Sequence, residues 1–297
     1  MCRLFGMSGA PARVQATFWL LDAPDSLTAQ SRRNPDGTGL GFFAADGAAE
    51  LHRCPLAAYE DQTFAQEART ATSRTFIAHV RYASTGAVAP ENTHPFEQRG
   101  RLFAHNGVVE DLDLLDEELG DARSLVHGET DSERVFALIT KHIDACGDVT
   151  EGLVTALRWI AGRLRVYALN IVLTTPTDVW ALRYPDPHQL FILERAAGGP
   201  HGDRHLQHAS AAGTVRVRSA DLARTPAVVV ASERMDEDAG WRALQPGELV
   251  HVDGQGAVSS QIVLPSPPAR PLTVADLEPR AAESQSAVSA PPSSAPP

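Results

Sequence analysis

Four short stretches of the sequence carry residue types that can perform one reaction together. They are Cys2-Arg3-Leu4-Phe5-Gly6, His79-Val80-Arg81-Tyr82-Ala83-Ser84, His105-Asn106-Gly107 and Glu129-Thr130-Asp131-Ser132-Glu133. Cys2 follows Met1, and cysteine is small enough for the initiator methionine to be removed in front of it. A terminal cysteine carries a thiol and a free α-amine on one residue, which gives a nucleophile its own general base.

The four stretches together supply the groups needed to cleave an amide. The α-amine of Cys2, with a reference pKa of ~7.7–8.0, can activate the thiol without a histidine. The tetrahedral oxyanion needs preorganised donors, which the Asn106 side chain and the Gly107 backbone N–H can supply. Arg81 can grip a carboxylate through two hydrogen bonds, and Asp131 can pair with an ammonium group. This combination predicts glutamine or another γ-glutamyl compound as the substrate.

Each stretch by itself has a simpler structural explanation. A cysteine beside the start of a chain can be incidental, and an arginine at a strand end is commonly a solvated charge. Asn106-Gly107 is a frequent hairpin turn, and Asp131 before a helix is typical of an N-cap residue, with Thr130 as the competing cap. The hypothesis of one amide-cleaving site therefore requires the four stretches to meet in space.

The composition favours a soluble globular protein without nucleic-acid or membrane partners. Hydrophobic residues make up 43% and charged residues 21% of the 297 residues, enough for one large domain or two small ones. The net charge of −11 argues against a phosphate-backbone partner. No apolar run approaches the ~18 residues of a transmembrane helix, and no secretory-signal pattern is found. Three cysteines without a CxxC pair predict reduced thiols and a cytoplasmic location.

Short β-type runs alternate with turn signals along the chain, and helical patterns gather mainly in its middle. The expected strands are Cys2–Ser8, Gly39–Ala44, Leu51–Cys54, Thr75–Tyr82, Arg101–His105, Tyr167–Thr174, Asp178–Tyr184, Leu190–Glu194, Ala227–Ala231, Glu248–Val252 and Ala257–Val263. The expected helices are Ala12–Leu21, Ala58–Thr70, Leu112–Leu119, Ser132–Ala145 and Val149–Ala161. Because helices do not follow each strand in turn, the pattern favours an α+β layered fold over a doubly wound parallel sheet.

One change in composition divides the chain. Residues 265–297 hold nine of the 21 prolines, with Ser, Ala and Glu between them. A segment that is poor in large apolar residues cannot bury enough surface to offset the loss of chain entropy. We therefore expect one domain over residues 1–264 and a disordered tail over residues 265–297.

In order and spacing, the motifs resemble those of class II glutamine amidotransferases, which are N-terminal nucleophile (Ntn) hydrolases. The resemblance spans roughly residues 2–255. Besides the four stretches, it includes Asn34-Pro35-Asp36-Gly37-Thr38-Gly39-Leu40-Gly41 and Asn92-Thr93-His94-Pro95-Phe96. It implies a four-layer αββα sandwich and an enzyme that uses no metal or other cofactor.

The resemblance also implies roles for individual residues. Cys2 would be acylated by a γ-glutamyl group with release of ammonia or an amine, and water would then release glutamate. Arg81 and Asp131 match the residues that hold the carboxylate and the amine of the substrate. Asn106 and Gly107 match the residues of the oxyanion hole.

Three further positions enter through the resemblance. Ser84 stands where relatives commonly carry threonine, which implies a hydroxyl for the substrate carboxylate. His94 and His105 match positions that look structural, so we expect them to orient other groups rather than to transfer protons.

Two other groups of residues resemble different kinds of site. His201, His205 and His208 are metal-ligand types, but they lie in a Gly-rich loop without structured spacing, so we expect no metal site. The glycines at positions 37, 39 and 41 resemble a nucleotide-binding loop. No helical pattern follows them, which favours a turn that leads into a strand.

The substrate and the partner stay open at this stage. No stretch resembles a sugar-phosphate isomerase, a phosphoribosyl-binding module or an ATP-binding module. The compact form resembles stand-alone members that act on γ-glutamyl compounds in ergothioneine synthesis or glutathione breakdown. One hypothesis is a hydrolase of glutamine or a γ-glutamyl amide, with a separate synthase as a possible acceptor of ammonia. The alternative is a non-catalytic regulatory or glutamine-binding subunit with the same fold.

Overall fold

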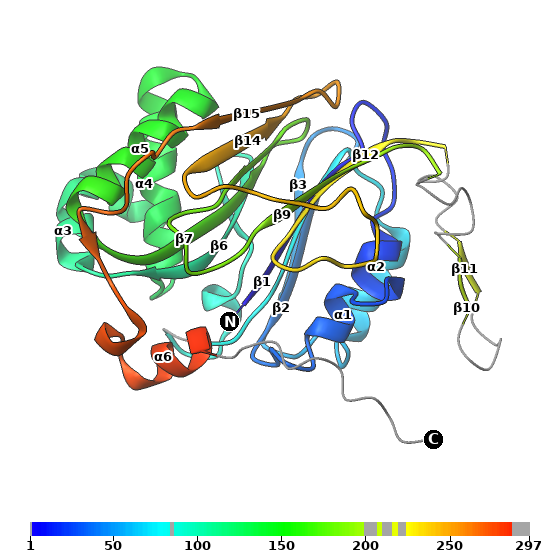
Figure 1. Ribbon diagram of the computed structural model, residues 1–297, viewed down its shortest axis with the longest axis horizontal. Helices are drawn as coiled ribbons and strands as arrows, with labels where there is room; N and C mark the ends of the chain where they lie inside the picture. The colour runs from blue at the N-terminus through cyan, green and yellow to red at the C-terminus, as the bar shows by residue number, and fades with distance from the viewer. Residues whose placement is uncertain (1, 84–85, 199–206, 210–215, 219–223, 287–297) are drawn as a thin grey trace.

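The computed structural model describes residues 2–83, 86–198, 207–209, 216–218 and 224–286 (Figure 1). In these ranges, two large sheets lie face to face in the centre of the molecule. The first has the order β13-β9-β12-β1-β4-β2-β3, with antiparallel neighbours throughout. Its strands are β1 (Arg3–Ser8), β2 (Thr38–Phe43), β3 (Ala49–Cys54), β4 (Thr75–Val80), β9 (Phe191–Arg195), β12 (Ala227–Ala231) and β13 (Arg242–Ala243).

The second sheet has the order β15-β14-β8-β7-β6-β5 and is also antiparallel along this path. Its strands are β5 (Phe96–Gln98), β6 (Arg101–Val109), β7 (Arg165–Thr174), β8 (Val179–Leu182), β14 (Glu248–Val252) and β15 (Val258–Ile262). A short strand, β16 (Arg270–Pro271), lies parallel to β7. Strands β10 (Gln207–Ala209) and β11 (Arg216–Arg218) pair with each other outside both sheets.

The central strand β1 shows why the two sheets pack together. Its side chains alternate between two cores. Leu4 lies in the apolar layer between the sheets, whereas Phe5 and Met7 lie in the core on the outer face of the first sheet. A Cβ atom on Gly6 would lie 2.8 Å from Val172 of β7, so this glycine allows the sheets to approach closely. Both faces of the strand are therefore buried.

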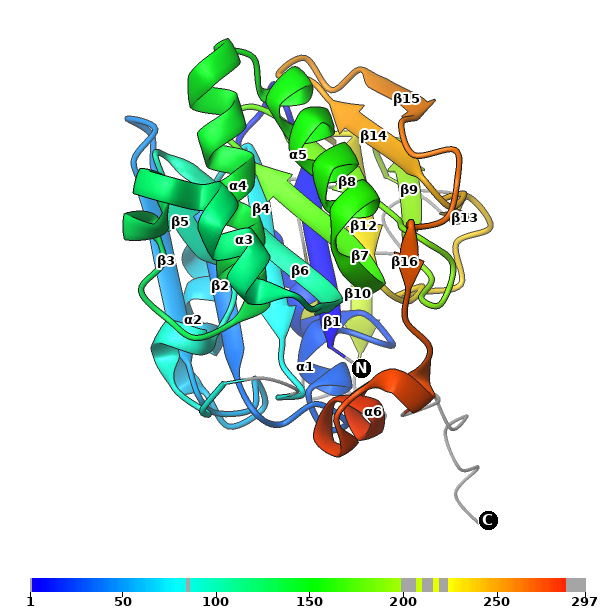
Figure 2. The ribbon, with the colours of Figure 1, turned by 90° about the vertical axis from the view of Figure 1, so that its left-hand side faces the viewer.

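Helices cover the outer face of each sheet (Figure 2). Against the second sheet lie α3 (Leu112–Leu119), α4 (Asp131–Cys146) and α5 (Val149–Arg163), and against the first sheet lie η1 (Phe18–Asp22), α1 (Leu27–Gln30) and α2 (Gln62–Thr70). Short helical turns are η2 (Pro90–Asn92), η3 (Gly120–Leu125) and η5 (Val274–Asp276). The layers follow the order helix, sheet, sheet, helix, which confirms the expected α+β fold. None of the helices in the described ranges has both the length and the apolar run that a membrane crossing requires.

The expected helix over 12–21 is wrong in its first half. Val14 exchanges backbone hydrogen bonds with Ser73 and forms an isolated β-bridge there. Its side chain is fully buried against the first sheet. Helical structure begins only at Phe18, so pairing with Ser73 outweighed the helical pattern of the sequence.

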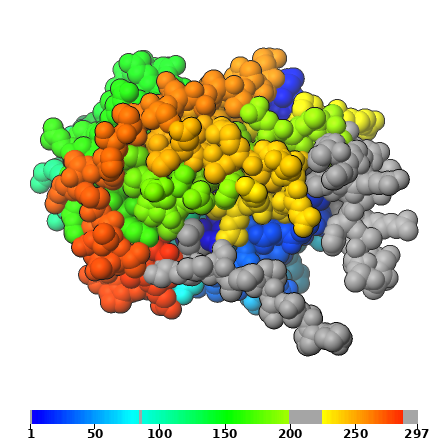
Figure 3. All heavy atoms as spheres, viewed as in Figure 1, coloured from blue at the N-terminus to red at the C-terminus, as the bar shows by residue number. Residues whose placement is uncertain are grey.

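The segment from residue 265 to residue 286 also differs from the expectation of a disordered tail. It contains β16, η5 and a helix, α6 (Pro279–Ser286). Leu272, Leu277 and Ala281 pack on β6 and β7 in a small apolar core. Figure 3 shows the segment as a band along the surface of the molecule. A few well-placed apolar residues were enough to dock it, although its overall composition is polar; residues 287–297 lie outside the described residues.

Candidate active site

The fold places the predicted nucleophile at the end of a central strand. Cys2 immediately precedes β1, whose first residue, Arg3, lies opposite Val80 of β4. The Cys2 thiol donates to the carbonyl oxygen of Tyr82 (3.3 Å), and the Tyr82 N–H donates to Sγ (3.2 Å). The backbone of Tyr82 therefore fixes the position of the sulfur, a contact that the sequence did not reveal.

The surroundings of Cys2 favour the neutral thiol. Burial raises the pKa of this thiol, while the Tyr82 N–H and the positive charges of Arg81 and Arg3 act in the opposite direction. A thiol with a raised pKa is a poor nucleophile until a base removes its proton. The site therefore needs a general base close to Sγ.

The predicted oxyanion-hole residues lie inside strand β6 rather than in a hairpin turn. Asn106 is paired with Asn170 of β7. Its side-chain nitrogen Nδ2 donates to the Cys2 carbonyl oxygen (3.1 Å). A Cβ atom on Gly107 would lie only 1.9 Å from the carbonyl oxygen of Ala168. A side chain at this position would clash with β7, so only glycine fits here.

Arg81 extends from the end of β4 and is 4% exposed. Its backbone is held by hydrogen bonds to Gly37 and Asp36, at the turn that leads into β2. Its guanidinium donates to the carbonyl oxygen of Ala87 (2.9 Å). Burial lowers the pKa of Arg81, and the negative charges of Asp36 and Asp131 oppose that effect. The turn before β2 thus positions the arginine. The glycines of this stretch predicted the turn into a strand but not its contact with Arg81.

At the start of α4, Thr130 caps the helix, and Asp131 is left for the predicted role in substrate binding. Thr130 is the N-cap residue, and its hydroxyl accepts a hydrogen bond from the Glu133 N–H (3.2 Å). Asp131 is the first helical residue instead of the cap, and its Oδ2 accepts from the Val109 N–H (2.9 Å). Of the two residues that the sequence offered as the N-cap, Thr130 fills this position and satisfies the free N–H group.

The hydrogen bonds of His105 and Ser132 leave one oxygen of the Asp131 carboxylate without a donor among the described residues. His105 Nε2 lies 3.3 Å from the Ala168 carbonyl oxygen, and its Nδ1 lies 2.9 Å from the Ser132 hydroxyl. A carbonyl only accepts, so Nε2 carries the proton. Burial lowers the pKa of His105, which favours the neutral ring, with Nδ1 accepting from Ser132. The single hydroxyl proton then does not reach Asp131 Oδ1, 3.4 Å away.

Two other buried histidines, His79 and His94, face each other, and His94 also lines the Cys2 pocket. The rings of His79 and His94 lie 4.3 Å apart, and no ring nitrogen of either has a hydrogen-bond partner among the described residues. Burial lowers the pKa of His79 to about 3 and that of His94 well below its ordinary value. Both rings are therefore neutral at neutral pH, and the His79 interaction was not anticipated from the sequence.

Most of the predicted residues meet in one small pocket. Its walls are formed by Cys2, Arg81, Tyr82, Asn92, His94, His105, Gly107, Thr130, Asp131 and Ser132. Asn106 is not part of this wall and reaches the site through its hydrogen bond to Cys2. Ser84 lies outside the described residues, as do His201 and His205, and the His208 side chain is not described either.

Asn92 is a pocket residue whose role the sequence did not show. Its Oδ1 accepts from the Glu129 N–H (2.8 Å), and its Nδ2 lies 3.3 Å from the Ala87 carbonyl oxygen. It thus connects the segment that follows Arg81 to the start of α4. In the described ranges, no cluster of His, Cys, Asp and Glu is arranged to hold a metal ion.

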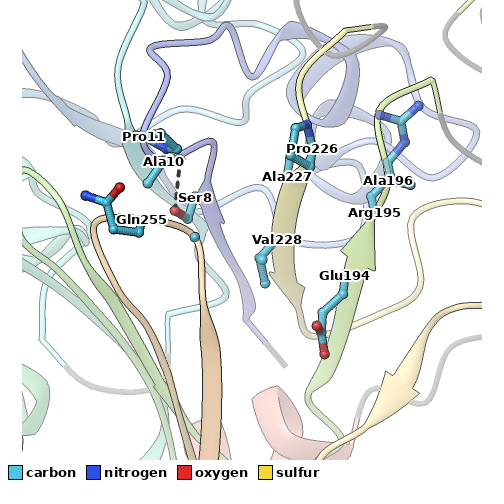
Figure 4. A pocket seen from close by; sticks show the side chains of 11 residues that line it. Ser8, Ala10, Pro11, Glu194, Arg195, Ala196, Pro226, Ala227, Val228 and Gln255 are labelled. Atoms are coloured by element: carbon cyan, nitrogen blue, oxygen red, sulfur yellow. Dashed lines mark hydrogen bonds between the residues drawn. The ribbon is translucent and has the colours of Figure 1, made fainter.

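A second, larger pocket lies at the opposite end of β1 (Figure 4). Its walls come from the ends of β1, β9 and β12 and from the turn between β14 and β15. Ser8, Arg195 and Gln255 are among its residues. It contains none of the site residues that the sequence predicted.

The comparisons with known proteins agree with the motifs. Residues 1–274 match the family of class II glutamine amidotransferases. The chain is 31% identical over 271 residues to the gamma-glutamyl-hercynylcysteine sulfoxide hydrolase of Mycobacterium tuberculosis, covering 86% of this chain and 94% of the relative. The namesake of Mycolicibacterium smegmatis is 31% identical over 264 residues, covering 85% of this chain and 96% of the relative.

Solved structures show the same fold. The glutamine phosphoribosylpyrophosphate amidotransferase of B. subtilis superposes with a TM-score of 0.61 at 20% identity, covering 90% of this chain but only 50% of that one. A protein named "predicted glutamine amidotransferase" from Pseudomonas aeruginosa PA01 gives a TM-score of 0.57 at 22% identity, covering 88% of this chain and 100% of that one. The chain belongs to the class II glutamine amidotransferases.

Proposed function

We propose that the protein is a cysteine-dependent amidohydrolase that cleaves a γ-glutamyl amide bond through a thioester on Cys2. The observation that carries this proposal is the meeting of Cys2, Arg81, Gly107 and Asp131 in one pocket. These residues come from four separate stretches of the chain. Family membership and the hydrolase names of the mycobacterial relatives support the same reaction class.

The reaction begins with Cys2 as the first residue of the mature chain. Its α-amine removes the thiol proton, and Sγ forms a bond with the γ-carbonyl carbon. The carbon–nitrogen bond then breaks, and the leaving ammonia or amine takes up the proton. Water attacks the thioester, and the carbon–sulfur bond breaks. Glutamate is released, and the sulfur takes up a proton to restore the thiol. The raised pKa of the Cys2 thiol supports the need for a base in the first step.

Asn106 and Gly107 would stabilise the oxyanion that forms when sulfur attacks. The Asn106 amide nitrogen already lies 3.1 Å from the Cys2 carbonyl oxygen, next to the nucleophile. The Gly107 N–H is rigidly placed because β6 and β7 are in close contact there. Preorganised donors of this kind act mainly on the transition state.

Arg81 and Asp131 would bind the α-carboxylate and the α-amine of the γ-glutamyl group. Both side chains are almost completely buried in the pocket wall, where few water molecules compete for them. The hydrogen bond from Ser132 to neutral His105 leaves Asp131 Oδ1 free to accept from an ammonium group. Ser84 is proposed as an additional hydroxyl for the carboxylate because of its place in the motif.

The identity of the leaving amine distinguishes one γ-glutamyl substrate from another. The mycobacterial relatives, which this chain matches over nearly their whole length, are named for a γ-glutamyl conjugate with a large amine. We therefore propose a γ-glutamyl amide of this kind, or glutamine, as the substrate. Transfer of ammonia to a separate synthase, and a cytoplasmic location, belong to the same proposal.

A substrate screen tests this function. Glutamine, glutathione and other γ-glutamyl amides are incubated with the full chain, and released glutamate is measured. We expect release from at least one compound, and a Cys2→Ala variant that folds normally should release none. Binding of γ-glutamyl compounds without any turnover would instead favour the non-catalytic subunit.

A further inference from the structure

The C-terminal helix α6 lies beside the start of β1, where Cys2 is located (Figures 1 and 2). The segment that carries α6 packs through Leu277 and Ala281 on Val108 and Ala168. These two strand residues are neighbours of Gly107, since Val108 follows it and Ala168 contacts it. The helix therefore rests on the same part of the second sheet that forms the candidate oxyanion hole.

Buried polar contacts fix one face of α6. Gln285 Oε1 lies 2.6 Å from His188 Nε2, and the side chains of both residues are almost fully buried. Burial lowers the pKa of His188 to about 4, so the neutral ring donates this hydrogen bond at neutral pH. Ser284 is also fully buried. The helix is thus a docked element with a defined orientation.

The opposite face of α6 contacts Tyr82, one of the residues that line the Cys2 pocket. Tyr82, whose backbone holds the Cys2 sulfur, donates from its hydroxyl to Glu283 Oε1 (3.3 Å). Arg280 stands three residues before Glu283 and therefore shares its face of the helix. The positive charge of Arg280 lowers the pKa of Arg81, which places it within electrostatic range of the pocket.

Arg280 is an exposed cation in this position. Over the described residues, no side chain or backbone oxygen forms an ion pair or a hydrogen bond with its guanidinium. An exposed arginine beside a pocket can bind a carboxylate through two parallel hydrogen bonds. The charge is thus available to a group that protrudes from the pocket.

We propose that α6 forms the wall for the leaving group and that Arg280 selects γ-glutamyl amides whose leaving amine carries a carboxylate. This inference rests on the proposed function. The γ-glutamyl half would occupy the pocket between Cys2, Arg81 and Asp131, so the amine half would extend past Tyr82, which also lines this pocket. The first cation it meets on α6 is Arg280.

The test compares two substrates that differ only in the charge of the leaving group. We would measure kcat/KM for γ-glutamylglycine and for γ-glutamylglycinamide with the full chain, with Arg280→Gln and with Arg163→Gln. Arg163 is an exposed arginine at the end of α5 and serves as the matched control. The ratio of the two values within one variant cancels any general loss of activity.

We expect the unaltered chain to prefer the carboxylate by tenfold or more and Arg280→Gln to bring the ratio close to one. Arg163→Gln should keep the ratio of the unaltered chain. Turnover of both substrates with a ratio near one, or a ratio that Arg280→Gln leaves unchanged, overturns this inference alone. No turnover of any γ-glutamyl compound overturns the proposed function as well.

Discussion

The two ends of strand β1 present different environments although six residues of one strand connect them. At the Cys2 end, the pocket wall combines a thiol, a buried arginine and a buried carboxylate. At the Ser8 end, the pocket is larger and also includes a buried arginine, Arg195, but its wall contains no thiol. The larger pocket is therefore not the one that holds the predicted catalytic residues.

The difference lies in how the polar groups are constrained. At the Cys2 end, backbone from distant parts of the chain holds two of the side chains, with Tyr82 against Cys2 and Val109 against Asp131. At the Ser8 end, the Ser8 hydroxyl accepts from the nearby Ala10 N–H (3.3 Å), which is a local turn contact. Preorganised groups that point into one space are what catalysis requires.

The largest effect on activity should come from replacing Cys2, at one end of β1, whereas replacing Ser8, at the other end, should have little effect. Cys2→Ala removes the nucleophile, and we expect kcat/KM for a γ-glutamyl amide to fall by a factor of about 10⁴ or more. Ser8→Ala serves as the control on the same strand and should change kcat/KM less than about twofold. Equal losses in the two variants would contradict the distinction between the two ends.

Asn106→Ala should have the next largest effect. It removes a donor that acts on the oxyanion, so we expect kcat to fall by about 10²–10³, with a much smaller change in KM. Gln255→Ala, in the wall of the other pocket, is the control. A near-normal kcat for Asn106→Ala, measured by glutamate release, would remove this residue from the mechanism.

Asp131→Asn tests how the pocket recognises the α-amine. Loss of one partner of a desolvated charge pair should reduce kcat/KM for glutamine by about 10²-fold. Glutaramic acid is glutamine without the α-amine, so the unaltered chain should discriminate strongly against it and Asp131→Asn much less. Glu194→Gln, at the Ser8 end, should keep the full discrimination. Equal turnover of the two substrates by the unaltered chain would contradict the γ-glutamyl assignment.

The smallest effect concerns the pH dependence of stability, to which the buried His79 should contribute. The pKa of His79 is lowered to about 3 in the folded state, whereas an unfolded histidine titrates near 6.5. The unfolded chain binds more protons between these values, so stability is complete above pH ~6.5 and falls as the pH decreases toward 3. Between pH 7 and pH 5 this histidine should cost about 2 kcal/mol of unfolding free energy.

Denaturant unfolding at pH 7 and at pH 5 measures this change. The unaltered chain gives the reference pH dependence of the free energy of unfolding. His79→Gln should make it shallower, even where it lowers stability at both pH values. A pH dependence that is identical in His79→Gln and in the unaltered chain would show that His79 does not titrate in this way.

The sequence predicted most of the residues that line the Cys2 pocket but few of the contacts that hold them in place. The motifs singled out four residues that line one pocket: Cys2, Arg81, Gly107 and Asp131. Short stretches can be recognised by the chemistry of their residues without knowledge of the fold. The strands around them followed from alternating apolar residues and turns. The backbone contact of Tyr82 with the sulfur depends on pairing across 80 residues, which no local pattern records.

The docking of α6 was missed for a related reason. Its segment reads as disordered by composition, since its apolar residues are few and widely spaced. Leu272, Leu277 and Ala281 nevertheless meet a complementary apolar surface on β6 and β7. Composition averages over a segment, whereas docking depends on which few residues face the surface.

The central claim is that Cys2, as the first residue of the mature chain, is the nucleophile. Purified active protein is treated with a glutamine-like diazo ketone, and intact-mass and peptide analysis locate the adduct. We predict a chain without Met1 that carries one adduct on Cys2, formed in parallel with the loss of activity. An active chain that retains Met1, or an adduct on Cys54 or Cys146 with Cys2 unmodified, would contradict this account.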